Sequence, residues 1–402
     1  MKVLVVHNYY QQPGGEDATF EQECRLLERY GHQVVRYQRT NHEIEGVRGW
    51  RRLRAALEIV WNRRMRRGFL DLLRRERPDV VHVHNTFFMI SPSIFAACEE
   101  AGVPVVQTLQ NYRMFCPAAV FFRAGRVCEE CLEHSLWRGI SHACYHGSRG
   151  ETAVVASMIA YNRRLGPWPG KVDAFIAVTP FGRRKLMQGG LPGERVAVKP
   201  NFVEPDPGEG RGAREYALFV GRLSAEKRAA TMLEAWTRLR EPVPLQIAGA
   251  GPEQNALEEQ ARRSSLAGVR FLGRLPRAET LKTMQGARFL VFPSEWYEGF
   301  PVTICEAFAC GTPVICSRLG AMEEVVEDGR TGFHYTPGNA AELAEKVAWA
   351  WSHPEEMRRM GREARREFEA KYTPETNYPL LLEIYGQAMA RKRGTQAIAA
   401  AV

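Results

Sequence analysis

Short apolar runs alternate with stretches of helical periodicity along almost the whole of this 402-residue chain. The run Val3–Val6, for example, is followed by Phe20, Cys24 and Leu27, which recur at helical spacing. Parallel strands need a crossover segment between them, usually a helix, so this alternation is typical of parallel sheets with helices on both faces. We therefore predict an α/β protein with doubly wound sheets.

The predicted strands fall into two series, and residues 201–214, which are rich in proline, glycine and aspartate, indicate a linker between them. The first series is Val3–Val6, Gln33–Tyr37, Val80–Val83, Val103–Leu109, Asp173–Val178 and Val196–Val198. The second series is Ala217–Val220, Leu245–Ala248, Val269–Leu272, Phe289–Phe292, Pro313–Cys316 and Gly332–Tyr335. We predict two Rossmann-like domains that face a cleft, residues 1–200 and 201–378, with ligands at the carboxyl ends of the strands.

Composition excludes several classes of protein. Apolar residues make up 45% of the chain and charged residues 25%, unlike a disordered tail or a collagen-like fibre. The opening run Val3–Val6 is too short for a secretory signal, and no run reaches the roughly 18 to 20 apolar residues that span a bilayer. Several of the nine cysteines lie among apolar neighbours, as reduced core cysteines do, so we expect a cytoplasmic protein.

Two loops that follow predicted strands of the second series offer groups for a phosphate. Arg222 and Lys227 lie five residues apart in a turn that Gly221 allows, and two such cations could clamp a diphosphate. Two solvated surface cations are the alternative for this pair. In the next loop, Gly249 and Gly251 allow a close backbone approach, which by itself is weak support for a ligand.

A third loop, after Phe289–Phe292, carries two carboxylates eight residues apart. Glu298 precedes a Gly-Phe-Pro turn, and Glu306 lies within a helix that Pro301 can open. We expect the amides near Pro301–Ile304, at the start of that helix, to point outward and form an anion site. Glu306 stands among apolar residues and needs a partner, so both carboxylates are predicted to accept hydrogen bonds from hydroxyls that flank a phosphate. A surface glutamate and a helix-face glutamate are the alternative.

The segment EGFPVTICEAFACGTPVICS (residues 298–317) resembles the Glu-x7-Glu region of family 4 glycosyltransferases, which have the GT-B fold. The resemblance continues through GAMEEVVEDGRTGFHY (residues 320–335) and back through GRLSAEK (residues 221–227). HNYYQQPGGED (residues 7–17) and NYRMFCP (residues 111–117) resemble the acceptor-side half of bacterial members that build cell-surface polysaccharides.

The resemblance implies a retaining sugar transfer from a nucleotide diphosphate sugar, UDP- or GDP-linked, with no catalytic metal. In this chain Arg222 and Lys227 would neutralise the diphosphate, Glu306 would accept hydrogen bonds from ribose hydroxyls, and Glu298 would bind a hydroxyl of the donor sugar. The other residues predicted for the donor site are Gly14, Gly15, Gly249, Gly251, Gly299, Phe300, Pro301 and Thr303.

One position departs from the family pattern. Many members place a histidine against the donor sugar after the strand that corresponds to Val103–Leu109, and this chain has Gln110 there. Glutamine donates and accepts hydrogen bonds but carries no proton, so binding is expected at this position and acid–base catalysis is not. On the preceding strand, His82 and His84 are predicted to face opposite sides, with a structural role as the default for both.

The family also implies a lipid-linked or glycan acceptor, and assembly of a surface polysaccharide or glycolipid at the inner face of the cell membrane. The N-terminal domain would bind the acceptor and the C-terminal domain the donor, with a last helix, residues 379–392, returning to the first domain. The alternatives are a nucleotide-sugar epimerase or hydrolase of the same fold, and a non-catalytic module that binds a membrane or nucleic acid.

Four cysteines form the pattern C-x11-C-x2-C-x12-C in a loop-rich insertion, residues 111–150: they are Cys116, Cys128, Cys131 and Cys144. This spacing suits a closed tetrahedral zinc site, which would be structural because it leaves no open position for catalysis. Four reduced cysteines, or a disulfide formed on oxidation, are the alternative.

A basic segment, residues 48–77, carries eleven arginines against three acidic residues. Trp50, Leu53, Leu57 and Val60 recur in it at helical spacing, as in an amphipathic helix suited to an anionic membrane surface. A helix packed on the sheet with a solvated arginine face is the alternative. Nucleic acid is not expected as a partner, because no recognition motif or row of stacking aromatics accompanies the arginines.

Overall fold

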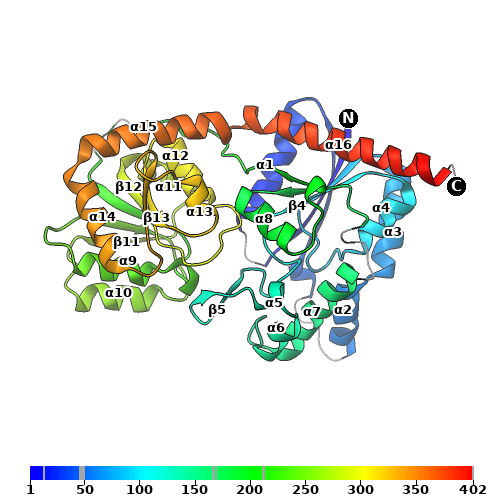
Figure 1. The fold of residues 1–402 in the computed structure, drawn as a ribbon, viewed down its shortest axis with the longest axis horizontal. Coiled ribbons are helices and arrows are strands. Elements are labelled where there is room, and N and C mark those ends of the chain that lie inside the picture. Colours follow the sequence, from blue (N-terminus) through cyan, green and yellow to red (C-terminus); the bar gives the residue numbers. More distant parts are fainter. Residues whose placement is uncertain are drawn as a thin grey trace. The chain divides into compact units, whose positions relative to one another are not determined.

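The computed structural model describes residues 1–11, 14–44, 50–164, 168, 170–210, 212 and 214–400, without the side chains of residues 44, 50–53, 55 and 398–400. This part of the chain forms two compact units (Figure 1). The N-terminal unit contains Met1–Phe121, Cys128–Pro200 and the chain from Asn377 onward. The C-terminal unit contains Phe122–Val127 and Asn201–Thr376.

The N-terminal unit is built on a parallel sheet of six strands in the order β2-β1-β3-β4-β7-β8. Its strands are β1 (Lys2–Tyr9), β2 (Gln33–Thr40), β3 (Val80–Val83), β4 (Val105–Leu109), β7 (Ala174–Ala177) and β8 (Val196–Val198). Its helices are α1 (Gly15–Arg29), α2 (Trp50–Val60), α3 (Arg63–Glu76), α4 (Ser93–Ala101), α5 (Glu130–Glu133), α6 (Trp137–Ser141), α7 (Arg149–Arg164), α8 (Pro180–Gln188) and α16, which begins at Pro374 in the C-terminal unit (Pro374–Ala400).

One face of this sheet is covered by helices from opposite ends of the chain, α1 and α16. Val3 and Val5 of β1 pack in a single buried cluster with Phe20 of α1 and with Leu381 and Tyr385 of α16. Full burial of a large apolar side chain contributes roughly 1.5–3 kcal/mol. The last helix is therefore part of the core of the N-terminal unit.

The C-terminal unit has a second parallel sheet of six strands, in the order β11-β10-β9-β12-β13-β14, with a buried cluster on each face. Its strands are β9 (Tyr216–Val220), β10 (Leu245–Ala248), β11 (Val269–Gly273), β12 (Ala287–Phe292), β13 (Val314–Ser317) and β14 (Gly332–Tyr335). Its helices are α9 (Ala229–Thr237), α10 (Gln254–Arg263), α11 (Arg277–Gly286), α12 (Val302–Ala309), α13 (Ala321–Val325), α14 (Ala340–Ser352) and α15 (Pro354–Lys371).

The predicted α/β class and the two parallel sheets are confirmed. A small antiparallel hairpin was not predicted: β5 (Phe122–Arg123) pairs with β6 (Arg126–Val127) inside the cysteine-containing insertion. Its turn residues, Ala124 and Gly125, both have positive φ angles. The strands are only two residues long, too short for an alternating pattern to be visible in the sequence.

The basic segment forms two helices, α2 and α3, where the sequence suggested one amphipathic pattern. The helical conformation is interrupted between Val60 and Arg63. Asn62 caps α3 there, because its Oδ1 accepts a hydrogen bond from Met65 N (2.8 Å). α3 buries Phe69 and Leu73 against the unit, whereas Leu57 of α2 is 66% exposed. Arg48 and the side chains of residues 50–53 lie outside the described part.

None of the described helices combines the length and hydropathy needed to cross a bilayer.

Candidate active site

The carboxyl ends of β9 and β12 are neighbours in the C-terminal sheet, and the strand order reverses between them. Ligands of doubly wound sheets bind outside such a reversal. The loops after the two strands are joined there, because Glu295 N donates to Glu226 O (3.0 Å) and Lys227 Nζ lies 2.6 Å from Glu298 Oε1. The structure thus brings together two predicted site residues from two different loops.

Glu298 is held by three donors on one oxygen. Its Oε1 accepts hydrogen bonds from Lys227 Nζ (2.6 Å), Ser294 Oγ (2.8 Å) and Trp296 Nε1 (2.8 Å). The Lys227 ammonium also lies over the rings of Phe292 and Trp296, at 5.2 and 5.4 Å from their centroids. Among the described residues, none donates to Glu298 Oε2. The carboxylate is therefore fixed through one oxygen and can accept a ligand hydroxyl through the other.

Arg222 differs from Lys227. Its side chain is exposed and forms no ion pair with a described residue, whereas the Lys227 side chain is only 18% exposed and paired. As it stands, Arg222 matches the alternative of a solvated surface cation. Its binding of a diphosphate stays a prediction. That role requires a ligand whose phosphates contact both Arg222 and Lys227.

Packing within the protein requires glycine at positions 249 and 251, whether or not a ligand binds there. A Cβ on Gly249 would lie 1.8 Å from Gly221 O, and a Cβ on Gly251 would lie 2.2 Å from Leu223 O. The close approach that these glycines allow is therefore to the backbone of the neighbouring loop after β9. Their contact with a nucleotide stays a prediction.

The start of α12 offers fewer amides than the sequence suggested. Val302 N donates to Phe300 O and Ile304 N donates to Pro301 O, each over 2.9 Å, and proline itself has no N–H. The expectation of free amides throughout Pro301–Ile304 was too generous, because the turn at Pro301 uses two of them. The amides of Gly299, Phe300 and Thr303 are left for an anion.

Glu306 of α12 has the partner that its apolar surroundings require. Arg277 Nε, from the first residue of α11, lies 3.4 Å from Glu306 Oε1, and the glutamate side chain is 14% exposed. Burial raises the pKa of Glu306 above its usual range, and Arg277 counteracts this only in part. A partly compensated carboxylate of this kind gains from further donors such as the hydroxyls of a ribose.

In the N-terminal unit, the strand order reverses between β1 and β3, and the predicted glycines follow β1. Asp17 fixes the start of α1, because its Oδ2 accepts from Gly14 N (2.8 Å) while its Oδ1 lies 2.7 Å from His7 Nε2. A Cβ on Gly14 or on Gly15 would meet nothing within 4 Å. The chain therefore leaves open space beside both glycines.

Glu16, which sequence reasoning missed, lies beside the loop that carries Gln110. Gln110 is half-buried directly after β4, and the next residue, Asn111, donates through Nδ2 to Glu16 Oε1 (2.6 Å). The second carboxylate oxygen, Glu16 Oε2, is buried and has no hydrogen-bond partner. Burial raises the pKa of Glu16. This buried oxygen without a partner can therefore accept a hydrogen bond from a ligand hydroxyl.

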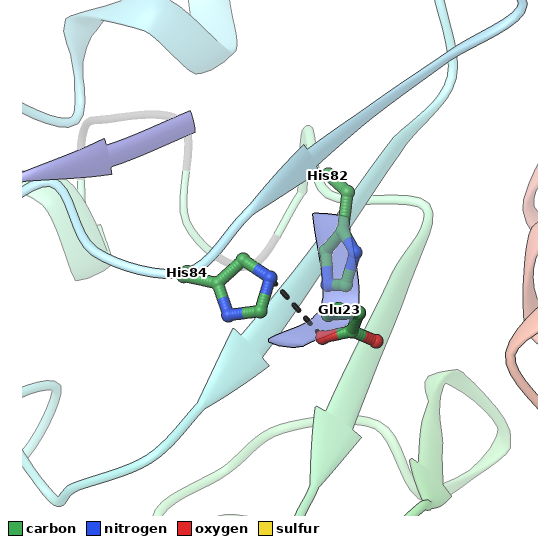
Figure 2. Close-up of side chains that lie close together, drawn as sticks. All are labelled: Glu23, His82 and His84. Atoms are coloured by element: carbon green, nitrogen blue, oxygen red, sulfur yellow. Dashed lines mark ion pairs between the residues drawn. The ribbon is translucent and has the colours of Figure 1, made fainter. Parts of the chain in front are cut away.

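Figure 2 shows Glu23, His82 and His84, which meet in the core of the N-terminal unit. The two histidine rings lie 4.5 Å apart on one side of the sheet, so the prediction that they face opposite sides was wrong. Positions two apart along a strand share a face. His84 Nε2 lies 3.2 Å from Glu23 Oε2, and Lys199 Nζ lies 3.3 Å from Glu23 Oε1.

The spacing of these three side chains would suit a metal ion, since their ligand atoms lie within 4.8 Å of one another. However, both nitrogens of His82 are already bonded, to Tyr385 OH and to Thr108 Oγ1 at 2.8 Å each, and burial lowers the pKa of His82 to about 3. Burial alone would raise the pKa of Glu23, but Lys199 and the histidines lower it. We interpret the group as a buried ion pair between Glu23 and Lys199, with His84 close to the carboxylate and His82 hydrogen-bonded through both nitrogens. This agrees with the structural role expected for both histidines.

The four cysteines of the insertion lie near one another but are not gathered tightly. Burial raises the pKa of Cys131 to about 12, and the nearby thiols of Cys116, Cys144 and Cys128 add to this rise. None of the four forms a disulfide with a described residue. Within the described ranges, the metal-like spacing is found at Glu23, His82 and His84 and not among these cysteines. Zinc at the cysteines stays a prediction.

Comparison with known proteins gives the family. Residues 206–367 match the model for glycosyl transferases group 1, and residues 14–201 match the glycosyl transferase 4-like domain. Glycogen synthase of Mycobacterium tuberculosis is 30% identical over 329 residues, which cover 80% of this chain and 71% of that protein. This chain belongs to glycosyltransferase family 4.

Other similar proteins agree with this assignment. D-rhamnosyltransferase WbpZ of Pseudomonas aeruginosa is 32% identical over 160 residues, 39% of this chain and 42% of that one. The solved structure of Anabaena HepE in complex with UDP has a TM-score of 0.67 at 19% identity and covers 95% of this chain and 99% of HepE. The predicted family, the GT-B fold and the enzyme class are confirmed: the protein is a glycosyltransferase that uses a nucleotide sugar.

The structure adds four residues to those that the family motif indicated: Ser294, Trp296, Arg277 and Glu16. The role of Trp296 could have been predicted from the sequence, because the indole N–H of a tryptophan two residues before a carboxylate in a turn can donate to that carboxylate. Arg277 and Glu16 had none, since their partners come from other elements of the fold.

Proposed function

We propose that this enzyme is a retaining glycosyltransferase that moves a sugar from a UDP- or GDP-linked donor to a lipid-linked glycan acceptor. The observation that carries the proposal is the Glu298 carboxylate, fixed through Oε1 beside Lys227 while Oε2 accepts no hydrogen bond from the described chain. This arrangement suits a sugar hydroxyl on the carboxylate and a phosphate beside the ammonium. HepE has been solved with UDP and with UDP-glucose, which makes a UDP-linked sugar the first donor to test.

In the proposed reaction, the bond between the anomeric carbon and the diphosphate oxygen breaks while a bond to the acceptor oxygen forms on the same face. The proton of the acceptor hydroxyl passes to the departing diphosphate oxygen, so no carboxylate nucleophile is needed. Lys227, Arg222 and the Thr303 amide stabilise the charge that builds on the diphosphate, and stabilisation of this kind usually contributes more to catalysis than any other effect. Glu306 accepts hydrogen bonds from the ribose hydroxyls, and Glu298 orients the donor sugar.

The acceptor belongs to the N-terminal unit in this proposal. Open space beside Gly14 and Gly15, the half-buried Gln110 and the orphaned Glu16 Oε2 together offer room and polar partners for a sugar hydroxyl. Gln110 contributes hydrogen bonds only.

We also propose that the basic segment, residues 48–77, attaches the enzyme to the cytoplasmic face of the cell membrane. The exposed Leu57 and the arginines of α2 and α3 support this, since each basic residue near an anionic surface adds ~1 kcal/mol. α3 packs its apolar face on the unit, so the surface contribution of α3 is electrostatic.

We propose separately that Cys116, Cys128, Cys131 and Cys144 bind a structural zinc, because the thiols of the other three lie near enough to Cys131 to raise its pKa. Metal analysis of the protein purified without chelators is expected to give one zinc per chain, lost in Cys131→Ser. Less than stoichiometric zinc in the unaltered protein would contradict it.

The test of the proposed function has two steps. Thermal stability is first measured with UDP, GDP and ADP, since a ligand at 100 times its Kd stabilises by ~2.7 kcal/mol. Nucleotide release from the sugar conjugate of the stabilising base is then followed with and without extracted membrane lipids. A transferase releases nucleotide only with acceptor, a hydrolase releases it without, and an epimerase changes the sugar without release. Either of the last two results would overturn the proposal.

A further inference from the structure

A cavity in the N-terminal unit has no part in the donor chemistry. It has a volume of about 590 Å³ and opens between the end of β2, α2 and α3. A second hollow of about 580 Å³ shares five lining residues with it: Arg54, Glu58, Asn62, Arg64 and Gly68. Because they share these residues, we treat the two hollows together and call them the arginine cavity; its arginines are Arg39, Arg54, Arg63, Arg64 and Arg67.

The arginines of this cavity fall into two groups. Arg39 is bonded to Glu43, and Arg54 lies 2.9 Å from Glu58, so two of the charges are compensated within the chain. Arg63, Arg64 and Arg67 form no ion pair with any residue that the structure describes. Arg66, on the same helix but outside the cavity, is paired with Glu100 at 2.6 Å. Three arginines without an ion pair thus line the cavity, together with Glu58, which is paired with Arg54.

The rest of the lining is partly apolar. Met65, Met89 and Trp61 contribute to it beside Tyr37, and Gly68 of α3 leaves room, since a Cβ there would meet nothing within 4 Å. Guanidinium groups present paired N–H donors that match phosphate oxygens, and the apolar side chains suit a group that is not itself charged. The chemistry of the cavity fits a phosphate joined to a less polar body.

We propose that the arginine cavity binds the phosphate or diphosphate of the acceptor. The inference rests on the proposed function in one respect, because it specifies the acceptor as a phosphorylated one. A lipid diphosphate and a soluble sugar phosphate share this chemistry, and the two sources are separated by the experiment. Arg64, which lines both parts of the cavity, contacts the phosphate directly in this proposal.

The experiment titrates inorganic pyrophosphate into the full-length protein by calorimetry and compares four single variants. Arg64→Gln removes charge from the cavity, Gly68→Leu fills it without changing charge, and Arg75→Gln is the matched control on the same helix, at an exposed residue outside the cavity. Lys227→Gln identifies any pyrophosphate bound at the donor loops. UDP and GDP are titrated in parallel.

We expect Arg64→Gln to weaken one class of pyrophosphate site by about tenfold, the worth of a charge-assisted hydrogen bond. Gly68→Leu should weaken the same class of site by a similar factor because the leucine side chain occupies part of the cavity, while pyrophosphate binding in Arg75→Gln and nucleotide binding stay unchanged. Equal losses in Arg64→Gln and Arg75→Gln, or full binding in Gly68→Leu, would show general surface attraction and overturn the proposal. If neither UDP nor GDP binds while the cavity variants behave as expected, the proposed function falls and the anion site stands.

The source of the phosphate is then read from two further arms. Vesicles of phosphatidylcholine carrying a polyprenyl diphosphate bind in an Arg64-dependent way if the acceptor is lipid-linked, and glucose 1-phosphate competes with pyrophosphate if it is soluble. Binding in neither arm would overturn the assignment of the cavity to the acceptor.

Discussion

We propose that two regions of this enzyme bind an anionic partner, and their cations are held in different ways. At the donor loops, Lys227 is paired with Glu298, lies over two aromatic rings and is only 18% exposed. In the arginine cavity, Arg63, Arg64 and Arg67 have no carboxylate partner among the described residues. A cation fixed by a carboxylate can stabilise charge at one point with little reorganisation, whereas a free set of arginines adapts to a variable ligand. This difference favours a catalytic role for the donor loops and a ligand-binding role for the arginine cavity.

The largest effect is expected at the fixed region. Glu298→Gln keeps the size of the side chain but removes the charge that holds Lys227 and accepts the donor hydroxyl. We predict that kcat for sugar transfer falls by about 100-fold or more, as on removal of one preorganised group from a polar active site. Steady-state kinetics with the donor found by thermal shift gives the number.

Glu234→Gln, at an exposed glutamate of α9 paired with Arg238, is the matched control and should leave kcat unchanged. If Glu298→Gln retains most of the activity, the carboxylate does not orient the donor and the contrast between the two regions fails.

The next effect concerns Glu306 and pH. Burial raises its pKa, and ribose hydroxyls bind its ionised form, so nucleotide binding has to release the proton. Affinity for the nucleotide should therefore rise with pH up to and through the raised pKa of Glu306, and fall on acidification. In Glu306→Gln the affinity should drop about tenfold and its pH dependence should flatten. Calorimetry across pH 4 to 8 measures both, and an unchanged pH profile in the variant would contradict the assignment.

A smaller effect is expected from Trp296, which acts on Glu298 by positioning. Trp296→Phe keeps an aromatic ring under Lys227 but removes one of three hydrogen bonds to Glu298 Oε1. We predict that kcat falls by roughly tenfold while the affinity for the nucleotide alone stays the same. A parallel loss of nucleotide affinity would show that Trp296 supports the fold of the loop and does not orient the carboxylate.

The smallest effects separate glycines needed by the fold from glycines that leave room for a ligand. Gly251→Ala forces a Cβ against Leu223 O and should destabilise the protein by about 1–3 kcal/mol. Gly14→Ala meets open space, and because alanine is a poorer N-cap than glycine it should destabilise the protein by about 1 kcal/mol at most while lowering activity. Thermal melts measure the stability of both variants, and assays of sugar transfer measure their activity. A Gly251→Ala variant as stable as the unaltered protein would contradict a structural role for Gly251.

The sequence predicted the strands well because each carries its own signal. The runs Val80–Val83, Val196–Val198, Leu245–Ala248 and Gly332–Tyr335 were predicted to the residue. The need of Glu306 for a partner was also visible, from its apolar neighbours alone. That the partner is Arg277 was not, because the pairing depends on how α11 packs beside α12.

Where prediction failed, the cause was geometric. His82 and His84 were assigned to opposite sides although positions two apart on a strand share a face. The break between α2 and α3 depends on the Asn62 cap, which a continuous amphipathic pattern conceals. Glu16 could not be found from sequence, because its orphaned oxygen is defined by what surrounds it in space.

The proposed mechanism requires that the loops after β9 and β12 bind the nucleotide of the donor and orient its sugar. Calorimetric titration of the bare nucleotide into the unaltered protein, Glu306→Ala and Glu298→Gln is the decisive test. We predict binding to the unaltered protein, a large loss in Glu306→Ala and near-normal binding in Glu298→Gln, because Glu298 contacts the sugar. Absence of binding to the unaltered protein, or equal binding by Glu306→Ala, would contradict this assignment of the donor site.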